Sequence, residues 1–197
     1  KCCGDPARRL GHEYLFAIQA QENIELMKNH GVKKIITQCP HCFNTLKNEY
    51  PDYGGNFEVI HHVELLTSLV KSGKLQLKTK FDQTITYHDS CYLGRYQQIY
   101  NEPRNLLKAT GLELKEMKHH HKKSLCCGAG GGRMWLEENE GERINVMRTD
   151  EALAVNPDYI ATACPYCLSM FDDGLATRKA RDKVETLDVA EILEKAL

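Results

Sequence analysis

Nine cysteines dominate the chemistry available to this 197-residue chain. In its second half, Cys126 and Cys127 are adjacent, and glycine occupies four of the five positions that follow them. Cys91 precedes this pair by thirty-four intervening residues, and Cys164 and Cys167 form the motif CPYC thirty-six residues after it. Five thiols in three clusters are a ligand set for a soft metal, because thiolates select zinc, copper(I) or iron–sulfur clusters.

The first half repeats most of this pattern. Cys2 and Cys3 are followed by Gly4, and thirty-five residues lie between Cys3 and Cys39, which begins a CPHC motif. A counterpart of Cys91 is missing, and we expect that the chain begins at Lys1 in the middle of this first motif. The candidate metal ligands are therefore Cys2, Cys3, Cys39, Cys42, Cys91, Cys126, Cys127, Cys164 and Cys167.

Adjacent cysteines favour a multinuclear cluster over a single ion, because their side chains leave the backbone in different directions and reach different irons. The glycines after Cys127 fit this interpretation. Gly128, Gly130, Gly131 and Gly132 lack a Cβ, so the backbone can approach a large inorganic core and point N–H groups at its sulfides. Phosphate binding is disfavoured, because GAGGGR lacks the spacing of a dinucleotide motif.

Two alternatives remain open from the residues alone. A structural zinc site is one, since two CxxC pairs commonly supply its four ligands. A thiol–disulfide oxidoreductase is the other, because CPHC and CPYC after a strand have the local form of thioredoxin-type motifs. The dithiol alternative leaves both CC pairs unexplained, and no proline follows Cys167 to face the dithiol.

Composition excludes several classes of protein. Lysine and arginine total 26 against 27 for aspartate and glutamate, so no overall charge attracts nucleic acid. No apolar run approaches the roughly 18 to 20 residues that span a bilayer. The cysteines follow β-rich runs in a chain that is 42% hydrophobic, which favours metal-bound thiolates in a reducing compartment over a disulfide framework.

Strands and helices are predicted to alternate along the chain. The expected strands cover 32–38, 57–61, 84–88, 112–117 and 158–162, and the expected helices cover 13–30, 43–50, 63–71, 96–110, 134–154 and 189–197. Pro103 is a candidate break in one helix, and residues 118–123 (KHHHKK) are expected to form a solvated loop without a metal. This order predicts an α/β protein with a parallel sheet and cysteines at strand carboxyl ends.

The offset of 124 to 125 residues between the two cysteine sets predicts a duplication. We expect two similar modules, each with a small parallel sheet flanked by helices. The first covers 1–76 and is the C-terminal part of a truncated module, and the second covers 77–197 and is complete. The boundary is expected between about 72 and 80.

Charged residues flank Cys91 and have two interpretations. His88, Asp89 and Arg95 either tune the charge of a cluster and handle a proton, or cap the following helix and pair on the surface. His61 and His62 end a predicted strand, and a structural role is favoured there.

The motifs resemble a known family. Cys91, then Cys126, Cys127 and Gly128, then Cys164 and Cys167 are similar to the cysteine-rich CCG module of the heterodisulfide reductase catalytic subunit and its relatives. The segments KCCGDPARRLG, EYLFAIQAQENIE, CPHCFNTLKNEYP, HDSCYLGRY and CCGAGGGRMW resemble the branch linked to fatty-acid β-oxidation, where a membrane protein passes electrons from electron-transfer flavoprotein to quinone. The resemblance covers essentially the whole chain. Ser90 departs from it, because proline is expected before the cysteine.

The resemblance implies the C-terminal part of an iron–sulfur oxidoreductase, with one or two [4Fe-4S] clusters in cubane or non-cubane form. It implies cluster ligation by Cys91, Cys126, Cys127, Cys164 and Cys167, and in the first module by Cys2, Cys3, Cys39 and Cys42 with one further cysteine. The implied partners are ferredoxin-like and haem-bearing membrane segments upstream or in other subunits, an electron-transfer flavoprotein or other donor, and a quinone or disulfide acceptor. The implied location is cytoplasmic, at the membrane face in the full-length protein.

Overall fold

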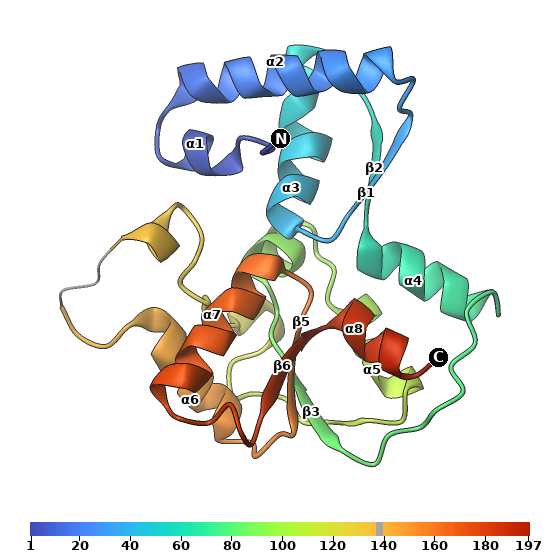
Figure 1. Cartoon of the computed structure of the whole chain (residues 1–197), viewed down its shortest axis with the longest axis vertical. Helices are drawn as coiled ribbons and strands as arrows, with labels where there is room; N and C mark the ends of the chain where they lie inside the picture. Colours follow the sequence, from blue (N-terminus) through green and yellow to red (C-terminus); the bar gives the residue numbers. More distant parts are fainter. Residues whose placement is uncertain (137–139) are drawn as a thin grey trace.

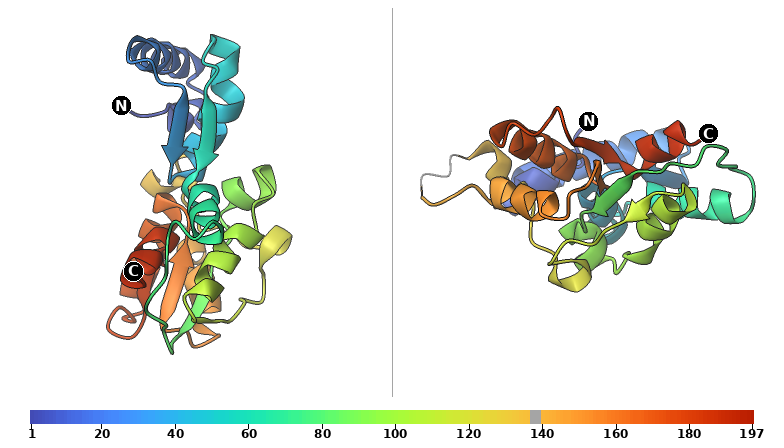
Figure 2. Two further views of the ribbon diagram at one scale, coloured as in Figure 1. Left: turned by 90° about the vertical axis from the view of Figure 1, so that its right-hand side faces the viewer. Right: turned by 90° about the horizontal axis from the view of Figure 1, so that it is seen from below.

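The computed structural model describes residues 1–136 and 140–197 (Figure 1). Helices and strands alternate along the chain, and the pairings between the described strands are all parallel. The prediction of an α/β fold with small parallel sheets flanked by helices is therefore confirmed. The molecule is elongated, with the first half of the chain at one end and the second half at the other (Figure 2).

The first half builds a small parallel sheet covered by helices. Its elements are α1 (Asp5–Arg9), α2 (Glu13–Asn29), β1 (Lys34–Thr37), α3 (Pro40–Asn44), a π-helical turn (Thr45–Glu49), a 3-10 turn (Tyr50–Tyr53), β2 (Glu58–His61) and α4 (His62–Lys71). β1 pairs with β2 in register from Lys34 opposite Glu58 to Thr37 opposite His61. α2 packs Phe16, Ala20 and Ile24 against Tyr50, which is the amphipathic face that its apolar spacing predicts.

The second half builds a larger parallel sheet in the order β4-β3-β5-β6. Its elements are β3 (Thr84–Tyr87), a π-helical turn (Tyr92–Tyr96), α5 (Asn101–Ala109), β4 (Glu113–Leu114), 3-10 turns (His121–Lys123 and Arg133–Trp135), α6 (Ile144–Leu153), β5 (Tyr159–Thr162), α7 (Pro165–Thr177), β6 (Glu185–Asp188) and α8 (Val189–Lys195). β5 lies between β3 and β6, so Tyr159 faces both Ile85 and Glu185.

The two halves share one hydrophobic core. Phe43, Val59 and Val63 of the first half pack in the same buried cluster as Ile85 and Leu107 of the second. A hydrogen bond of 2.8 Å between His62 Nε2 and Asp188 Oδ1 also joins them. The two halves therefore hold each other in fixed positions.

Several predicted elements are shorter than expected. The helix expected over 134–154 is wrong in its first part, because Arg133–Trp135 is a 3-10 turn, 137–139 lie outside the described residues, and α6 begins at Ile144. Gly141 has a φ of 71°, a left-handed conformation that does not continue a helix. The strand expected over 112–117 is reduced to Glu113–Leu114.

The helix expected over 96–110 begins only at Asn101, after the π-helical turn Tyr92–Tyr96 and an irregular link. Pro103 does not break it. The proline lies in the first turn of α5, where a backbone N–H has no acceptor within the helix, so its missing donor costs nothing.

No helix in the part of the chain that the structure describes is both long enough and apolar enough to cross a bilayer.

Candidate metal centre

Each CxxC motif begins a helix just beyond the carboxyl end of a parallel strand. β1 ends at Thr37, and α3 begins at Pro40, so Cys39 directly precedes the first helical turn. The Thr37 hydroxyl accepts a hydrogen bond from the Cys39 backbone N–H at 3.2 Å and donates to the Cys39 carbonyl at 3.5 Å. Thr162 makes the same pair of hydrogen bonds to Cys164, at 3.1 and 3.0 Å, before α7. A proline at the first helical position and a threonine in the turn thus orient both motifs.

A glycine directly follows each CC pair. Its backbone is in a left-handed conformation, which strains any residue that has a Cβ. Gly4 has a φ of 89° and Gly128 a φ of 88°, in the left-handed region. Their backbone N–H groups donate to the first sulfur of each pair, Cys2 Sγ at 3.4 Å and Cys126 Sγ at 3.3 Å. The third letter of the CCG pattern therefore has a physical reason, which is a left-handed turn that directs an N–H group at a cysteine sulfur.

Gly130 and Gly131, which are also predicted to lie at a cofactor, have different surroundings. A Cβ on Gly130 would lie 3.5 Å from the ring of His41, between the two halves. A Cβ on Gly131, whose φ is 67°, would meet no atom within 4 Å. A role for Gly128, Gly130 and Gly131 at a cofactor stays a prediction, and the close approach is strongest at Gly128.

The thiols of the second half form one contiguous group. The sulfurs of Cys127 and Cys167 are 3.3 Å apart. Cys126 interacts with both Cys127 and Cys91, and Cys167 interacts with Cys164. Cys127, Cys164 and Cys167 are buried, whereas Cys91 and Cys126 are half-buried. The pairing of β3 with β5 brings Cys91 beside Cys164 and Cys167 from distant parts of the chain.

The thiols of the first half form a second group that touches the first. The sulfurs of Cys3 and Cys42 are 3.3 Å apart, and Cys39 interacts with Cys42. Cys39 also interacts with Cys164 of the second half. The first turns of α3 and α7 face each other where this contact forms (Figure 1). The two groups are therefore neighbours in one centre.

These contacts separate the thiols into strong and weak acids. Hydrogen bonds from Cys127 and Cys91 lower the pKa of Cys126 to about 2, and the same contact with Cys126 raises the pKa of Cys127 to about 12. Cys164 and Cys42 lower the pKa of Cys39 to about 2 by hydrogen bonds. The thiols thus share protons that a soft cation would displace on binding.

His88 faces the second thiol group but does not suit a role as a metal ligand. One of its ring nitrogens lies within 4.8 Å of the sulfurs of Cys127 and Cys167. Arg148 Nε, which is always a donor, lies 3.2 Å from His88 Nδ1, so Nδ1 is the acceptor. Burial lowers the pKa of His88 to about 3, so the ring is neutral and its proton is at Nε2. A metal at Nε2 would move that proton to Nδ1, against the Arg148 donor.

Asp89 anchors a buried ionic network behind the same group of thiols. Arg104 donates to both of its carboxylate oxygens, at 2.7 and 2.8 Å, and also to Glu116 at 2.6 and 2.9 Å. Burial acts to raise the pKa of Asp89, but the hydrogen bonds and charge of Arg104 prevail and lower it. His88 and Asp89 are 1% and 3% exposed, so the expectation that they cap a helix and pair on the surface is wrong. Arg95 is exposed and donates to the Ser124 carbonyl.

Aromatic rings that sequence reasoning missed surround the thiols. His41, inside CPHC, is buried, shares a hydrogen bond of 2.9 Å with Asp5, and stacks on Tyr92 at 4.0 Å between centroids. Tyr166, inside CPYC, contacts the edge of His41 at 5.0 Å and also meets Trp135. Their place in the sequence could have identified them, because these rings lie within or next to the cysteine motifs. They form a group of stacked and edge-on rings next to the two CxxC motifs.

The geometry weighs against a single zinc ion and against a dithiol enzyme that uses the CPYC motif. A single tetrahedral zinc ion uses four ligands, whereas the second group alone gathers five thiols, and the first group continues from it. A dithiol enzyme must expose a thiol to its substrate, and Cys164 and Cys167 of CPYC are only 0% and 2% exposed, whereas Cys39 and Cys42 of CPHC are half-buried.

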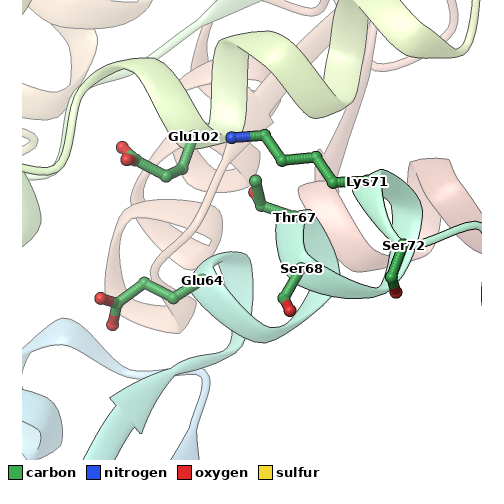
Figure 3. A pocket seen from close by; sticks show the side chains of 6 residues that line it. All are labelled: Glu64, Thr67, Ser68, Lys71, Ser72 and Glu102. Carbon is green, nitrogen blue, oxygen red and sulfur yellow. The ribbon is translucent and has the colours of Figure 1, made fainter.

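The cavity between α4 and α5 is separate from this centre. It has a volume of about 540 Å³ and is lined by Glu64, Thr67, Ser68, Lys71, Ser72 and Glu102 (Figure 3). None of these side chains is a thiol or an aromatic ring, so the cavity contributes nothing to the metal centre.

Replacing Gly128 with alanine is expected to damage the second group of thiols. The left-handed φ costs about 1–2 kcal/mol for a residue with a Cβ, and that Cβ would lie 3.1 Å from Ile144 Cβ. The N–H donor to Cys126 shifts as a result. We expect lower metal content per chain and a lower free energy of unfolding, measured by metal analysis and urea titration.

Gly131→Ala is the matched control, because Gly131 is also left-handed but its Cβ meets no neighbour. It is expected to lose stability while keeping its metal. Equal metal content in the two variants contradicts the assigned role of Gly128.

Comparison with known proteins adds two findings. The family model described as "CCG: Cysteine-rich domain" matches residues 1–47 and 85–172, which include all nine cysteines. The chain is also similar to "Probable iron-sulfur-binding oxidoreductase FadF" of Bacillus subtilis, with 52% identity over 198 residues that cover 100% of this chain and 28% of that protein.

Two further relatives have related names. "EtfAB:quinone oxidoreductase" of Syntrophomonas wolfei is 49% identical over 203 residues, covering 100% of this chain and 28% of that protein. One component of the dihydromethanophenazine:CoB–CoM heterodisulfide reductase of Methanosarcina barkeri is 33% identical over 203 residues, covering 100% and 49%. The chain thus spans between about a quarter and a half of the length of these relatives.

Proposed function

Because this chain belongs to the CCG family of cysteine-rich domains, we propose that it is an electron-transferring part of an iron–sulfur oxidoreductase. The observation that carries the proposal is the convergence of thiols from both halves into one partly buried centre at the carboxyl ends of parallel strands. The names of relatives as iron–sulfur and quinone oxidoreductases support it.

The residues of the centre fit an iron–sulfur cluster. Its donor set consists of soft thiolates, and the Gly4 and Gly128 N–H groups point at sulfur. When bound, a cluster of this kind takes up and passes on single electrons. The chain's own residues position the thiols, stack the rings of His41, Tyr92 and Tyr166 next to the cysteine motifs, and place a ring nitrogen of the neutral His88 near the sulfurs of Cys127 and Cys167. No side-chain acid or base is required.

We propose one [4Fe-4S] cluster in the second half, held by Cys91, Cys126, Cys127, Cys164 and Cys167, in the non-cubane form that five thiolates permit. A second cluster in the first half would use Cys2, Cys3, Cys39 and Cys42. The contact between Cys39 and Cys164 supports electron exchange between the two sites, because it makes them neighbours.

We also propose that the chain divides into similar modules at residues 76 and 77. Features that recur at matching positions support this division. The first half matches the second in three features. These are the strand before CxxC (β1 and β5), the threonine turn that follows this strand, and the glycine after the CC pair (Gly4 and Gly128). Glu64 and Glu191 each cap the helix that follows the next strand, by accepting from the backbone N–H of His61 and of Asp188.

The edge of β1 supports the view that the first module is incomplete. β5 pairs with both β3 and β6, whereas β1 pairs with β2 alone among the described strands. Ile36 on β1 is 52% exposed, but Ala161, its counterpart on β5, is fully buried. A hollow of about 260 Å³ beside this edge is lined by residues that include Cys3 and Cys42. A strand from the full-length protein, followed by the fifth cysteine of the first site, would fit there.

We propose further that the centre works within a larger protein or complex. Its partners would be ferredoxin-like and haem-bearing membrane segments, with electrons arriving from electron-transfer flavoprotein and leaving toward quinone or a disulfide. The printed names of two relatives, "EtfAB:quinone oxidoreductase" and "Probable membrane-anchored ferredoxin" of Chromohalobacter salexigens, support the quinone, the ferredoxin-like segment and the association with a membrane.

Anaerobic purification with iron and acid-labile sulfide analysis tests the function. We expect about four irons and four sulfides per occupied site, and a spectrum that dithionite bleaches. A variant with Cys2, Cys3, Cys39 and Cys42 all changed to alanine should keep the signal of the second half. Zinc alone in the purified protein, or metal-free thiols that cycle reversibly with a disulfide, would contradict the proposal.

A further inference from the structure

Residues 118–123 (KHHHKK), here called the basic loop, concentrate positive charge on the surface near the metal centre. Lys118, Lys122 and Lys123 are exposed. With three neighbouring rings, Tyr100, His120 and His121, they line a hollow of about 540 Å³. The loop lies at the edge of the molecule, in yellow-green to yellow (Figure 2).

The acidic groups around the basic loop are already engaged. Arg104 holds Asp89 and Glu116, and Arg148 pairs with Glu151 at 2.6 Å. The three lysines have no ion pair within residues 1–136 and 140–197. Their charge of about +3 is therefore not neutralised locally.

The same charges argue against a cation at this place. Ligand atoms of Glu116, His120 and His121 lie within 4.8 Å of one another, as in a metal site. The Glu116 carboxylate is already bound by Arg104 through two hydrogen bonds. Three lysines beside the histidines repel a further cation, so the surface suits an anionic partner.

Buried groups hold the basic loop in place. Asp89 accepts from the His121 backbone N–H at 2.6 Å. Arg148 donates to the His119 carbonyl at 3.0 Å and to Ser124 Oγ at 3.2 Å. The exposed lysines thus extend from an anchored backbone, which lowers the entropy lost when a partner binds.

The anchors also connect the basic loop to the thiols. Lys123 is three residues before Cys126, so their Cα atoms are at most about 11 Å apart. Ser124 Oγ donates to the carbonyl of Asp89, two residues before Cys91. A protein bound to the basic loop would therefore lie beside the two half-buried thiols of the second group, Cys91 and Cys126.

We propose that the basic loop docks an acidic redox protein that exchanges electrons with the metal centre through the side of Cys126. This inference rests on the proposed electron-transfer function, because it assigns the kind of partner and its place of contact. Positive charge at the electron exit steers such a partner and orients it on encounter.

Charge reversal with a matched control tests the proposal. The test variant carries Lys118→Glu, Lys122→Glu and Lys123→Glu, and the control carries Lys74→Glu, Lys78→Glu and Lys80→Glu. The control lysines are also exposed. They lie away from the centre, because the backbone of Lys78 pairs with Ala196 beyond the carboxyl end of α8. Both variants change the net charge equally.

Binding of an acidic flavodoxin is measured first, by calorimetry at low and high ionic strength. The test variant is expected to bind on the order of tenfold more weakly at low salt, and the control to bind as the unaltered protein does. Equal affinity in all three proteins, or an equal loss in both variants, overturns the proposal. This measurement needs no cluster, so it stands even if iron analysis contradicts the proposed function.

Electron exchange is measured next in the iron-loaded protein. Stopped-flow oxidation of the reduced protein by flavodoxin and by ferricyanide, a small anion, should slow in the test variant and become less dependent on salt. In a different outcome, the test variant reacts more slowly with ferricyanide while its binding to flavodoxin and its rate of oxidation by flavodoxin are unchanged. That result indicates a site for small anions, and it overturns the assignment of a protein partner.

Discussion

Cys91→Ala is expected to change the electron paramagnetic resonance signal of the second half and to lower its iron content. Cys91 has no cysteine neighbour in sequence, and it reaches the thiol group by interacting with Cys126. Because β3 pairs directly with β5, the end of β3 delivers Cys91 beside the CPYC motif. A five-thiolate cluster loses one ligand in this variant, whereas a simple cubane needs only four.

The measurement compares Cys91→Ala with Cys91→Ser and with Ser90→Ala. The serine variant offers an oxygen ligand and is expected to keep partial occupancy. Ser90 is the adjacent buried residue and is no ligand, so its replacement controls for local packing. An unchanged signal with full iron content in Cys91→Ala would make Cys91 a bystander and would leave a four-cysteine site, compatible with zinc or a cubane.

Asp89→Ala is expected to lower the free energy of unfolding by about 3–5 kcal/mol, because it leaves a buried guanidinium without its main partner. Arg104 is 4% exposed and donates to both oxygens of Asp89. Removing the Asp89 carboxylate also removes the acceptor for the His121 backbone N–H, so the amide protons of the basic loop should exchange faster. Urea titration and hydrogen exchange measure the two effects.

A double-mutant cycle isolates the pair. Arg104→Met in the Asp89→Ala background is expected to recover part of the stability, since it removes a buried guanidinium that only the partly exposed Glu116 still pairs with. Asp172→Ala is the surface control, because Asp172 pairs with Arg181 where both side chains are more than half exposed, and such pairs contribute at most about 1 kcal/mol. An equal loss in Asp89→Ala and Asp172→Ala contradicts the structural role of the network.

Local sequence signals predicted the elements that carry the cysteines. β-branched residues before the CxxC motifs predicted β1 and β5, whereas α7 after CPYC was not among the expected helices. These signals lie within a few residues of the element that they specify. The helix expected over 134–154 is wrong because Gly141 and its charged neighbours outweigh the apolar spacing of the flanking residues.

No local sequence signal predicted which side chains surround the thiols. Arg148 meets His88 from sixty residues away, and Arg104 meets Asp89 across fifteen. Both arginines lie on helices, where arginine is usually a solvated residue, and only the packing of α5 and α6 makes them internal. The contact of Cys39 with Cys164 was equally hidden, because it depends on how the two halves pack.

That contact between Cys39 and Cys164 also has a consequence for maturation of the protein. If the two sites bind metal as proposed, a metal at Cys164 releases the proton of that thiol and ends its interaction with the Cys39 thiolate. Filling one site therefore changes the affinity of the other, and by thermodynamic linkage the change is the same in both directions. Two such sites would therefore be loaded as a coupled pair, and the order in which they receive iron would leave the final free energy of loading unchanged.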